Sequence, residues 1–396
     1  MEIMKLHQKI NQFFWQVFSA FLIPILILIQ LGCPEPPETT GCGTHQIEVN
    51  GDCECEEGYH WSENETKCLM DTTSHNFVWD IDTLGGNGSY LNDVWIVDEN
   101  DIWVVGNIET DSGEYNAAHW NGEEWEFLGF GSNTLDLNSI QYFSDDDIWI
   151  CSGIIRHWNG EEWTRYHLWD MGVLDPNDGG VTEMGGASSS NIYFIGNKGT
   201  IVHFNGSDFT KMDSGTEISL IDIYGIEDNI YIVGYNVDNN GHSIALVNET
   251  GIWETDYYSE SLFPTNLDLG ILGRMYSTFS FIDTTYIIGK SGIMKLSISD
   301  KSETIVPSNL AFVDGRVPVR IRGNNYNDIM WVDIWGEIVH FNGVSWKLFQ
   351  NVYNSYPNGQ MRIRSMEYKN GICIGVGSLF TPQEKALIII GKQIDY

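Results

Sequence analysis

Two closely spaced arginine pairs are the residues of this sequence best suited to bind a ligand. The 396-residue chain contains eight arginines, and six of them lie between residues 274 and 364. Arg320 and Arg322 stand in the segment Val-Arg-Ile-Arg, and Arg362 and Arg364 stand in the matching segment Met-Arg-Ile-Arg. Period-2 alternation places both arginines of a pair on one face of a strand. A guanidinium group binds carboxylate, sulfate or phosphate through two parallel hydrogen bonds.

These two pairs, together with Arg274, predict an anion-binding site. The pairs occupy the same place in adjacent sequence repeats, so their guanidinium groups would converge in a central channel. The ligand would then be an acidic polysaccharide or the acidic tail of a partner protein. The alternative is that the arginines only neutralise acidic side chains in the channel wall.

One segment has the spacing of a calcium ligand loop. Asn236, Asp238 and Asn240 place oxygen ligands at positions 1, 3 and 5, and Gly241 follows at position 6. This pattern resembles the first half of a calcium-binding loop. Val247, at position 12, offers no ligand, and an ordinary Asn/Gly turn is the alternative. No other cofactor is predicted.

Four histidines recur at one position of a sequence repeat. Equivalent residues of a ring of repeats are dispersed around it, so these histidines cannot converge on one metal ion. We predict that each supports its own hairpin. They are His119, His157, His203 and His340.

The repeat that positions these groups extends from residue 77 to residue 396. Its clearest copies join an Asp/Asn-Ile-aromatic segment to a His-aromatic-Asn-Gly segment, and successive copies are 38 to 49 residues apart, the length of a propeller blade. Each copy holds β runs joined by polar or Asn-Gly turns, with no amphipathic helical period. The sequence therefore predicts an all-β, seven-bladed β-propeller of four-stranded antiparallel blades. Four copies are the most complete: 101–125, 147–163, 191–209 and 328–346.

The two ends of the repeat region predict how the ring closes. The seventh copy ends without a fourth strand, whereas the region begins with an unpaired run at 77–81 that resembles the outer run at 124–127. We predict that 77–81 completes the last blade, which removes an exposed sheet edge.

The pattern D-I-W-x-V-G followed by H-W-N-G-x-x-W resembles a group of exported bacterial β-propellers related to those with sialidase-type (Asp-box) repeats. The resemblance covers the whole of 77–396. It implies the fold, whereas a propeller fold by itself does not imply a particular function.

The N-terminal residues predict export. Residues 1–32 carry Lys5 and Lys9 and then an apolar run that has the length of a signal-peptide core. The run ends at Gly32-Cys33, which resembles a bacterial lipobox and implies lipidation of Cys33, with 33–41 as a tether. An uncleaved signal anchor and an ordinary secretory signal are the alternatives. All three place the rest of the chain outside the cytoplasm, on the cell envelope or outer surface.

Cysteine spacing agrees with export. Four cysteines lie in a segment too small for a hydrophobic core, at Cys42, Cys53, Cys55 and Cys68. The C-x-C followed by Gly-Tyr resembles the second half of an EGF-like module over 42–68, which implies the pairs 42–53 and 55–68. A zinc site is the alternative. Residues 69–76 would form a linker to the propeller.

Two further cysteines, Cys151 and Cys373, fall on second strands of blades that another blade separates. A disulfide between them would exceed the ~7 Å Cα–Cα limit. We therefore predict two buried free thiols.

The net charge limits the classes of partner. The chain carries 55 acidic and 20 basic residues, a formal charge of −35, which disfavours nucleic acid and anionic lipid as ligands. A lipid anchor would be the only membrane contact. The sequence predicts a monomeric, surface-anchored binding or scaffold protein that recognises a protein or an anionic glycan. The alternative is a carbohydrate-active enzyme, a glycosidase or lyase, on the same fold.

Overall fold

The computed structural model describes most of the chain from residue 42 onward and divides it into two units, 1–71 and 72–396. The described residues are 42–49, 51–55, 59–61, 67–70, 72–131, 136–226, 229–236, 242–249, 251–259, 273–282, 284–297, 303–307, 309, 313, 315–349, 352 and 360–394. The predicted signal, the tether and the lipidation site Cys33 lie outside these residues. In the part of the chain described, no helix is long and apolar enough to span a membrane.

The N-terminal unit consists of two short hairpins held by two disulfides. β1 (Gln46–Val49) pairs with β2 (Asp52–Cys55), and β3 (Tyr59–Trp61) pairs with β4 (Cys68–Met70). The disulfides join Cys42 to Cys53 and Cys55 to Cys68. These are the two pairs implied by the EGF-like resemblance, and the unit is a small disulfide-rich module.

The second unit is a seven-bladed β-propeller, so the predicted fold is confirmed. Each blade of the described chain is a four-stranded antiparallel sheet; six are simple meanders, and blade 7 has the order β30-β31-β32-β5. Among the described residues, the helical positions are the 3₁₀ turn η1 (Asn197–Gly199) in blade 3 and the single residue Val352. The strands of blades 1 to 4 are β6 (Tyr90–Asp98), β7 (Asp101–Thr110), β8 (Gly113–Trp120) and β9 (Trp125–Leu128); β10 (Ser139–Ser144), β11 (Asp147–Cys151), β12 (Ile155–Trp158) and β13 (Trp163–Tyr166); β14 (Val181–Ser188), β15 (Asn191–Gly196), β16 (Ile201–Phe204) and β17 (Phe209–Met212); β18 (Leu220–Ile226), β19 (Asn229–Tyr235), β20 (Ser243–Glu249) and β21 (Ile252–Ser259). Those of blades 5 to 7 are β22 (Met275–Phe281), β23 (Thr284–Gly289), β24 (Gly292–Ser297) and β25 (Glu303–Pro307); β26 (Pro318–Asn325), β27 (Asp328–Asp333), β28 (Ile338–Phe341) and β29 (Trp346–Phe349); β30 (Met361–Lys369), β31 (Ile372–Leu379), β32 (Lys385–Gln393) and β5 (Phe77–Leu84).

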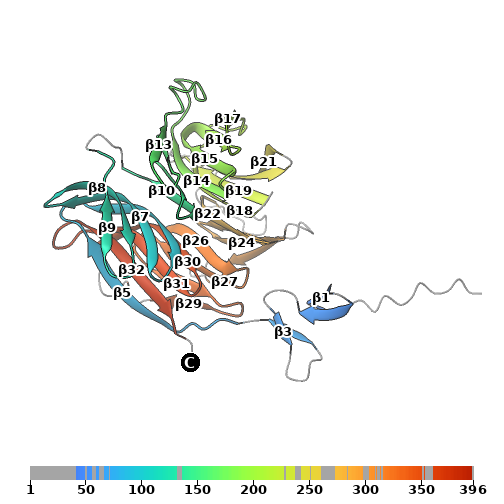
Figure 1. The fold of residues 1–396 in the computed structure, drawn as a ribbon. Coiled ribbons are helices and arrows are strands. Elements are labelled where there is room, and N and C mark those ends of the chain that lie inside the picture. Colours follow the sequence, from blue (N-terminus) through green and yellow to red (C-terminus); the bar gives the residue numbers. More distant parts are fainter. Residues whose placement is uncertain are drawn as a thin grey trace, which may run out of the picture. The chain divides into compact units, whose positions relative to one another are not determined.

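Strand β5 closes the ring. It is the outer strand of blade 7 and pairs antiparallel with β32, from Phe77 opposite Gln393 to Leu84 opposite Ala386. Figure 1 shows the blue β5 beside the red β32, so the beginning and end of the propeller share one sheet. Without β5, strand β32 would be an unpaired edge of blade 7, and pairing with β5 removes that edge.

The hydrophobic core lies between neighbouring blades, which explains why the inner strands are apolar at consecutive positions. All six residues of β27 are buried, and five of the six in β15 are. Trp149 and Trp331 are the largest fully buried side chains among the described residues. A strand covered on both faces has no solvent side and therefore needs no polar alternation.

In four blades the repeated histidine bonds to an Asp or Asn of the neighbouring strand and so holds one hairpin together. In blade 1, His119 Nε2 lies 2.9 Å from Asp101 Oδ1, and the His119 ring stacks on Trp103 with centroids 4.2 Å apart. The histidine thus fastens the third strand to the start of the second strand of its own blade, which is the structural role predicted for it. The equivalent pairs are His157 with Asp147 at 2.9 Å, His203 with Asn191 at 2.8 Å, and His340 with Asp328 at 2.7 Å.

The two predicted free thiols are present. Cys151 on β11 and Cys373 on β31 are both buried and unpaired. Burial raises the pKa of both thiols well above the ordinary value, so they remain protonated and unreactive.

Candidate functional site

The first strands of the seven blades surround the central channel and contact one another in sequence around the ring. In six of them a β-bulge directly precedes one inward position. A polar residue occupies that position in every blade, and we call these seven residues the channel ring. From blade 1 to blade 7 they are Asp93, Ser139, Glu183, Asp222, Ser277, Arg320 and Ser365.

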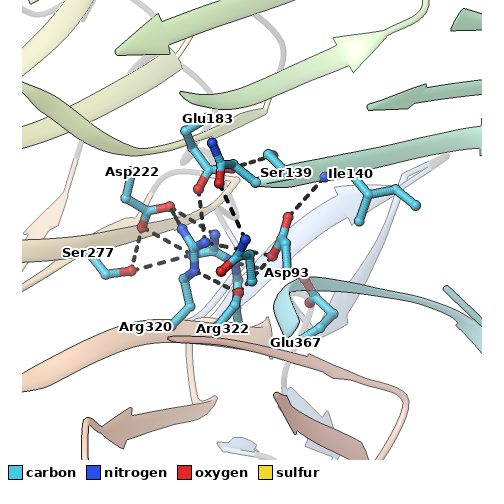
Figure 2. A network of polar contacts seen from close by, with 12 residues as sticks. Asp93, Ser139, Ile140, Glu183, Asp222, Ser277, Arg320, Arg322 and Glu367 are labelled. Carbon is cyan, nitrogen blue, oxygen red and sulfur yellow. Dashed lines mark hydrogen bonds and ion pairs between the residues drawn. The ribbon is translucent and has the colours of Figure 1, made fainter. Parts of the chain in front are cut away.

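Arg320 of blade 6 crosses the channel and contacts blades 1, 3, 4 and 7. Its Nη2 lies 3.7 Å from Asp93 Oδ1 of blade 1. Its Nη2 lies 2.9 Å from Glu183 Oε2 of blade 3, and its Nη1 donates to Asp222 Oδ1 of blade 4. Its Nε donates to Ser365 Oγ of blade 7 at 3.2 Å. Arg320 is only 5% exposed, and Figure 2 shows its guanidinium group between the two carboxylates.

Arg322, two residues further along β26, binds the same carboxylate. Its Nη2 lies 3.0 Å from Asp222 Oδ1, and its Nη1 donates to the Thr278 carbonyl at 3.0 Å. Its guanidinium carbon lies 5.0 Å from the centre of the Tyr224 ring, a cation–π contact. The Glu367 carboxylate is 3.8 Å from its Nε.

Hydrogen bonds between neighbouring blades complete the network around the channel. Asp93 of blade 1 accepts from the Ile140 backbone N–H of blade 2 at 3.0 Å and from Ser365 Oγ of blade 7 at 2.7 Å. Ser277 Oγ of blade 5 donates to Asp222 and accepts from the Ile321 N–H of blade 6. The network therefore fixes the blades relative to one another.

The channel holds more carboxylates than guanidinium groups, which perturbs their titration. Burial, with the nearby Asp93 and Asp222, raises the pKa of Glu183 to about 7 against the opposing effect of Arg320. Burial also raises the pKa of Glu367 to about 7. Asp222, although burial opposes its ionisation, has a lowered pKa because Arg320 and Arg322 both contact it. Four carboxylates thus share two guanidinium groups. Two of these carboxylates, Glu183 and Glu367, are partly protonated near neutral pH.

A small cavity adjoins this network on the side of the hairpins that join first to second strands. Its volume is about 120 Å³, and it is lined by Trp95, Gln141, Glu183, Tyr224, Arg322 and Glu367 among others. A water molecule takes up roughly 30 Å³ of liquid volume, so the cavity holds a few waters.

The expected convergence of both arginine pairs in the channel is wrong. Arg320 follows the bulge of β26, whereas in β30 the residue after the bulge is Ser365. In the structure Arg320 is therefore equivalent to Ser365, which is three residues beyond the Arg362 that the matching segments Val-Arg-Ile-Arg and Met-Arg-Ile-Arg would place opposite it. Arg362 is exposed and Arg364 half-buried, both nearer the beginning of the strand.

Arg274, Arg362 and Arg364 lie at the beginnings of first strands, on the face where fourth strands connect to first strands. We call them the rim arginines. Arg364 packs over the Tyr90 ring at 4.4 Å, and its Nη1 donates to Asn92 Oδ1 at 3.4 Å. Arg274 packs over the Tyr235 ring at 4.6 Å.

The rim arginines keep unused hydrogen-bond donors. In the described chain, the buried Nε atoms of Arg274 and Arg364 have no hydrogen-bond partner, and none of the three forms an ion pair. Arg316, the remaining arginine of this region, differs because it pairs with Glu337.

The calcium prediction falls largely outside the described residues, because Asp238 and Asn240 are not among them. Asn236 Oδ1 accepts a hydrogen bond at 3.1 Å from the N–H of Ser219, the residue that precedes β18. Within the described ranges, no group of three His, Cys, Asp or Glu side chains is arranged to hold a metal ion.

Sequence reasoning missed the carboxylates of the channel. Asp93, Glu183 and Asp222 each stand in a first strand and are each followed by an apolar residue, and Asp222 is also preceded by one, as in Leu-Ile-Asp-Ile for 220–223. A single acidic residue inside an otherwise apolar inner strand was the available signal. It becomes informative only when the blades are aligned at the bulge.

Comparison with known proteins gives the fold. No protein-family model and no curated protein sequence matches the chain. The solved structure of YCF48 bound to D1 peptide is 13% identical with a TM-score of 0.58, covering 82% of this chain and 98% of that one. YCF48 from Cyanidioschyzon merolae is 13% identical with a TM-score of 0.54, covering 79% and 98%. The C-terminal WD40 domain of Sif2 is also similar, at 13% identity and a TM-score of 0.46 over 85% and 89%. The two YCF48 structures thus agree with the seven-bladed β-propeller fold of this chain.

Proposed function

We propose that this protein is an exported binding propeller that recognises an acidic segment of a partner protein with its rim arginines. The observation that carries the proposal is that Arg274, Arg362 and Arg364 form no ion pair with any residue that the structure describes. The chain has 55 acidic residues, yet none of them within the described residues forms an ion pair with these three.

The electrostatics of the rim favour an anionic ligand. Burial and the neighbouring Arg362 both lower the pKa of Arg364. A bound carboxylate would relieve this repulsion and would accept hydrogen bonds from the guanidinium groups. Tyr90 and Tyr235 hold the two guanidinium groups in place, so little side-chain freedom is lost on binding.

The small size of the cavity beside the channel argues against catalysis there. Glu183 and Glu367, with pKa values near 7, have the titration expected of general acids. The adjoining cavity of about 120 Å³ is smaller than the roughly 300 to 1,000 Å³ typical of ligand pockets, so a sugar ring would not reach them. The network therefore favours a structural role for these acids, and the glycosidase or lyase alternative is less well supported.

Export and anchoring belong to the same proposal. Two disulfides in the N-terminal module are typical of an oxidising compartment. Together with the signal and lipobox-like residues ending at Cys33, they support a cell-envelope lipoprotein whose EGF-like spacer lies in the sequence between Cys33 and the propeller.

The test is fluorescence anisotropy with labelled hexaglutamate, and hexaglutamine as the uncharged control. We expect hexaglutamate to bind at low salt and hexaglutamine not to bind. The variant Arg362→Gln/Arg364→Gln should weaken binding by about tenfold or more, because charged hydrogen bonds are lost. The charge-matched control Lys385→Gln/Lys392→Gln, on β32, should bind as wild type.

Two outcomes would refute the rim proposal: no binding of hexaglutamate, or equal binding by both double variants. A polygalacturonate that binds more tightly than hexaglutamate, with the same dependence on the rim arginines, would replace the protein partner by an acidic glycan.

A further inference from the structure

A second pair of arginines stands on the face of blade 2 that packs against blade 1. Arg156 on β12 lies directly opposite Arg165 on β13. Arg156 is 6% exposed, and Arg165 is exposed. Like charges directly opposite each other on antiparallel strands destabilise a sheet unless something neutralises them.

The other blades show that an arginine is foreign to this position. Arg156 directly precedes the repeated histidine His157, and in three other blades the preceding residue is Ala118, Val202 or Val339. All three are buried apolar residues. Blade 2 therefore has a charged residue at a position that a buried apolar residue occupies in those three blades.

Arg156 has no counter-charge in the part of the chain that the structure describes. Its Nη1 is buried without a hydrogen-bond partner, and among the described residues it forms no ion pair. Among the described residues its guanidinium group makes a cation–π contact with the Phe130 ring, whose centre lies 5.2 Å from the guanidinium carbon. An unpaired buried charge is strongly destabilising, so it calls for a partner from outside the chain.

An aromatic groove continues from this arginine. Phe130 contacts Trp163 edge-to-face at 5.1 Å, and Trp163 packs on Trp158 at 5.7 Å. These two tryptophans line a groove of about 280 Å³ between blades 1 and 2, together with Trp103, His119, Leu128, Asp145 and Ile148. Trp158 and Trp163 lie on the same strand face as Arg156 and Arg165, two residues along each strand.

We propose that the cleft between blades 1 and 2 binds a carboxylate together with an adjacent apolar group, with the carboxylate on Arg156 and Arg165 and the apolar group in the groove of Trp103, Trp158 and Trp163. This site is separate from the rim arginines and does not depend on them.

The chemistry of the groove indicates a polypeptide segment as the natural occupant. A sugar ring requires several hydrogen-bond partners, and His119 already binds Asp101 while the Trp158 indole N–H already donates to the Asp145 carbonyl. The remaining lining is mainly apolar, which suits an apolar side chain next to an Asp, a Glu or a chain terminus.

The site can be tested with small probes that carry its two chemical features. The probe is 3-phenylpropionate, the matched control is the uncharged 3-phenylpropanamide, and binding is followed by ligand-observed NMR. We expect a millimolar dissociation constant for the carboxylate and about tenfold weaker binding of the amide. Inorganic phosphate should compete poorly, because it lacks the apolar group.

Three variants locate the binding. Arg156→Met should reduce 3-phenylpropionate binding about tenfold and should raise Tm without ligand, because an unpaired buried charge is removed. Arg165→Gln, at an exposed position, should weaken binding several-fold with little change in Tm. Lys211→Gln removes the charge at the position of blade 3 that corresponds to Arg165, and it should bind as wild type.

The outcomes separate this site from the rim. Arg362→Gln/Arg364→Gln should bind 3-phenylpropionate as wild type does. Undiminished binding in both Arg156→Met and Arg165→Gln, equal binding of acid and amide, or a lower Tm in ligand-free Arg156→Met would each overturn the proposal. Tighter binding of phosphate than of 3-phenylpropionate would overturn the carboxylate assignment.

Discussion

Arg320 of blade 6 and Glu183 of blade 3 are joined across the central channel, with 2.9 Å between Nη2 and Oε2, although 137 residues separate them in sequence. The same guanidinium group also binds Asp222 and Ser365, so one side chain bridges blades that share no strand pairing. The channel of this propeller is therefore filled by its own charged side chains. The arginines that remain available to a ligand lie elsewhere, at the rim and in blade 2.

Replacing Arg320 should destabilise the propeller strongly. In Arg320→Met, Asp93, Glu183 and Asp222 would lose their shared counter-charge in a buried site. Breaking a buried ion pair costs about 3 to 5 kcal/mol, so the free energy of unfolding should fall by that order in urea titrations. Arg362→Met, at an exposed rim position, should change it by less than about 0.5 kcal/mol. If the free energy of unfolding falls no further in Arg320→Met than in Arg362→Met, the channel network does not stabilise the propeller.

The excess of channel carboxylates predicts a loss of stability as pH rises. The folded-state pKa of Glu367 is raised to about 7 from an ordinary 4.5, so its contribution to stability is complete below pH 4.5 and is lost as pH rises through 7. Glu183 titrates in the same direction.

Glu367→Gln removes one of these titrations while keeping the shape of the side chain. The variant should match wild type near pH 4.5 and exceed its free energy of unfolding by about 3 kcal/mol at pH 8. Denaturant unfolding at the two pH values measures both differences. Parallel pH profiles for wild type and variant would mean that Glu367 ionises normally in the folded protein.

Thiol reactivity tests the blade assignment. In a protein with Cys33→Ser, the native state should not react with a thiol reagent, because Cys151 and Cys373 are buried with raised pKa values. After denaturation without reductant, two thiols should react, and after reduction six. A count of zero before reduction would require a disulfide between blades 2 and 7, which this fold does not permit.

The fold was predictable because each blade repeats the same local signals. The Asn-Gly turn, the Asp–His pair and the apolar second strand recur at blade spacing, and each acts within a single hairpin. His119 with Asp101 is an example in which sequence neighbours on paired strands meet in space. Local pairing of this kind can be inferred from spacing alone.

The site was less predictable because it depends on the bulges and on contacts between blades. A one-residue bulge before Arg320 and before Ser365 changes which residues face the channel, and no residue type marks it. Arg156 gave a signal that sequence reasoning passed over, since its repeat position is apolar in blades 1, 3 and 6. Its unpaired state is a property of the packing between blades 1 and 2 and is not encoded in any one repeat.

A crystal structure of the protein with bound hexaglutamate would test the rim proposal most directly. The account predicts peptide carboxylates within about 3 Å of the guanidinium nitrogens of Arg362 or Arg364, on the face where fourth strands connect to first strands. It also predicts that the ion pairs of Arg320 and Arg322 with Asp222 remain intact in the complex. A peptide bound in the channel in place of these ion pairs, or bound only at sites remote from the rim arginines, would contradict it.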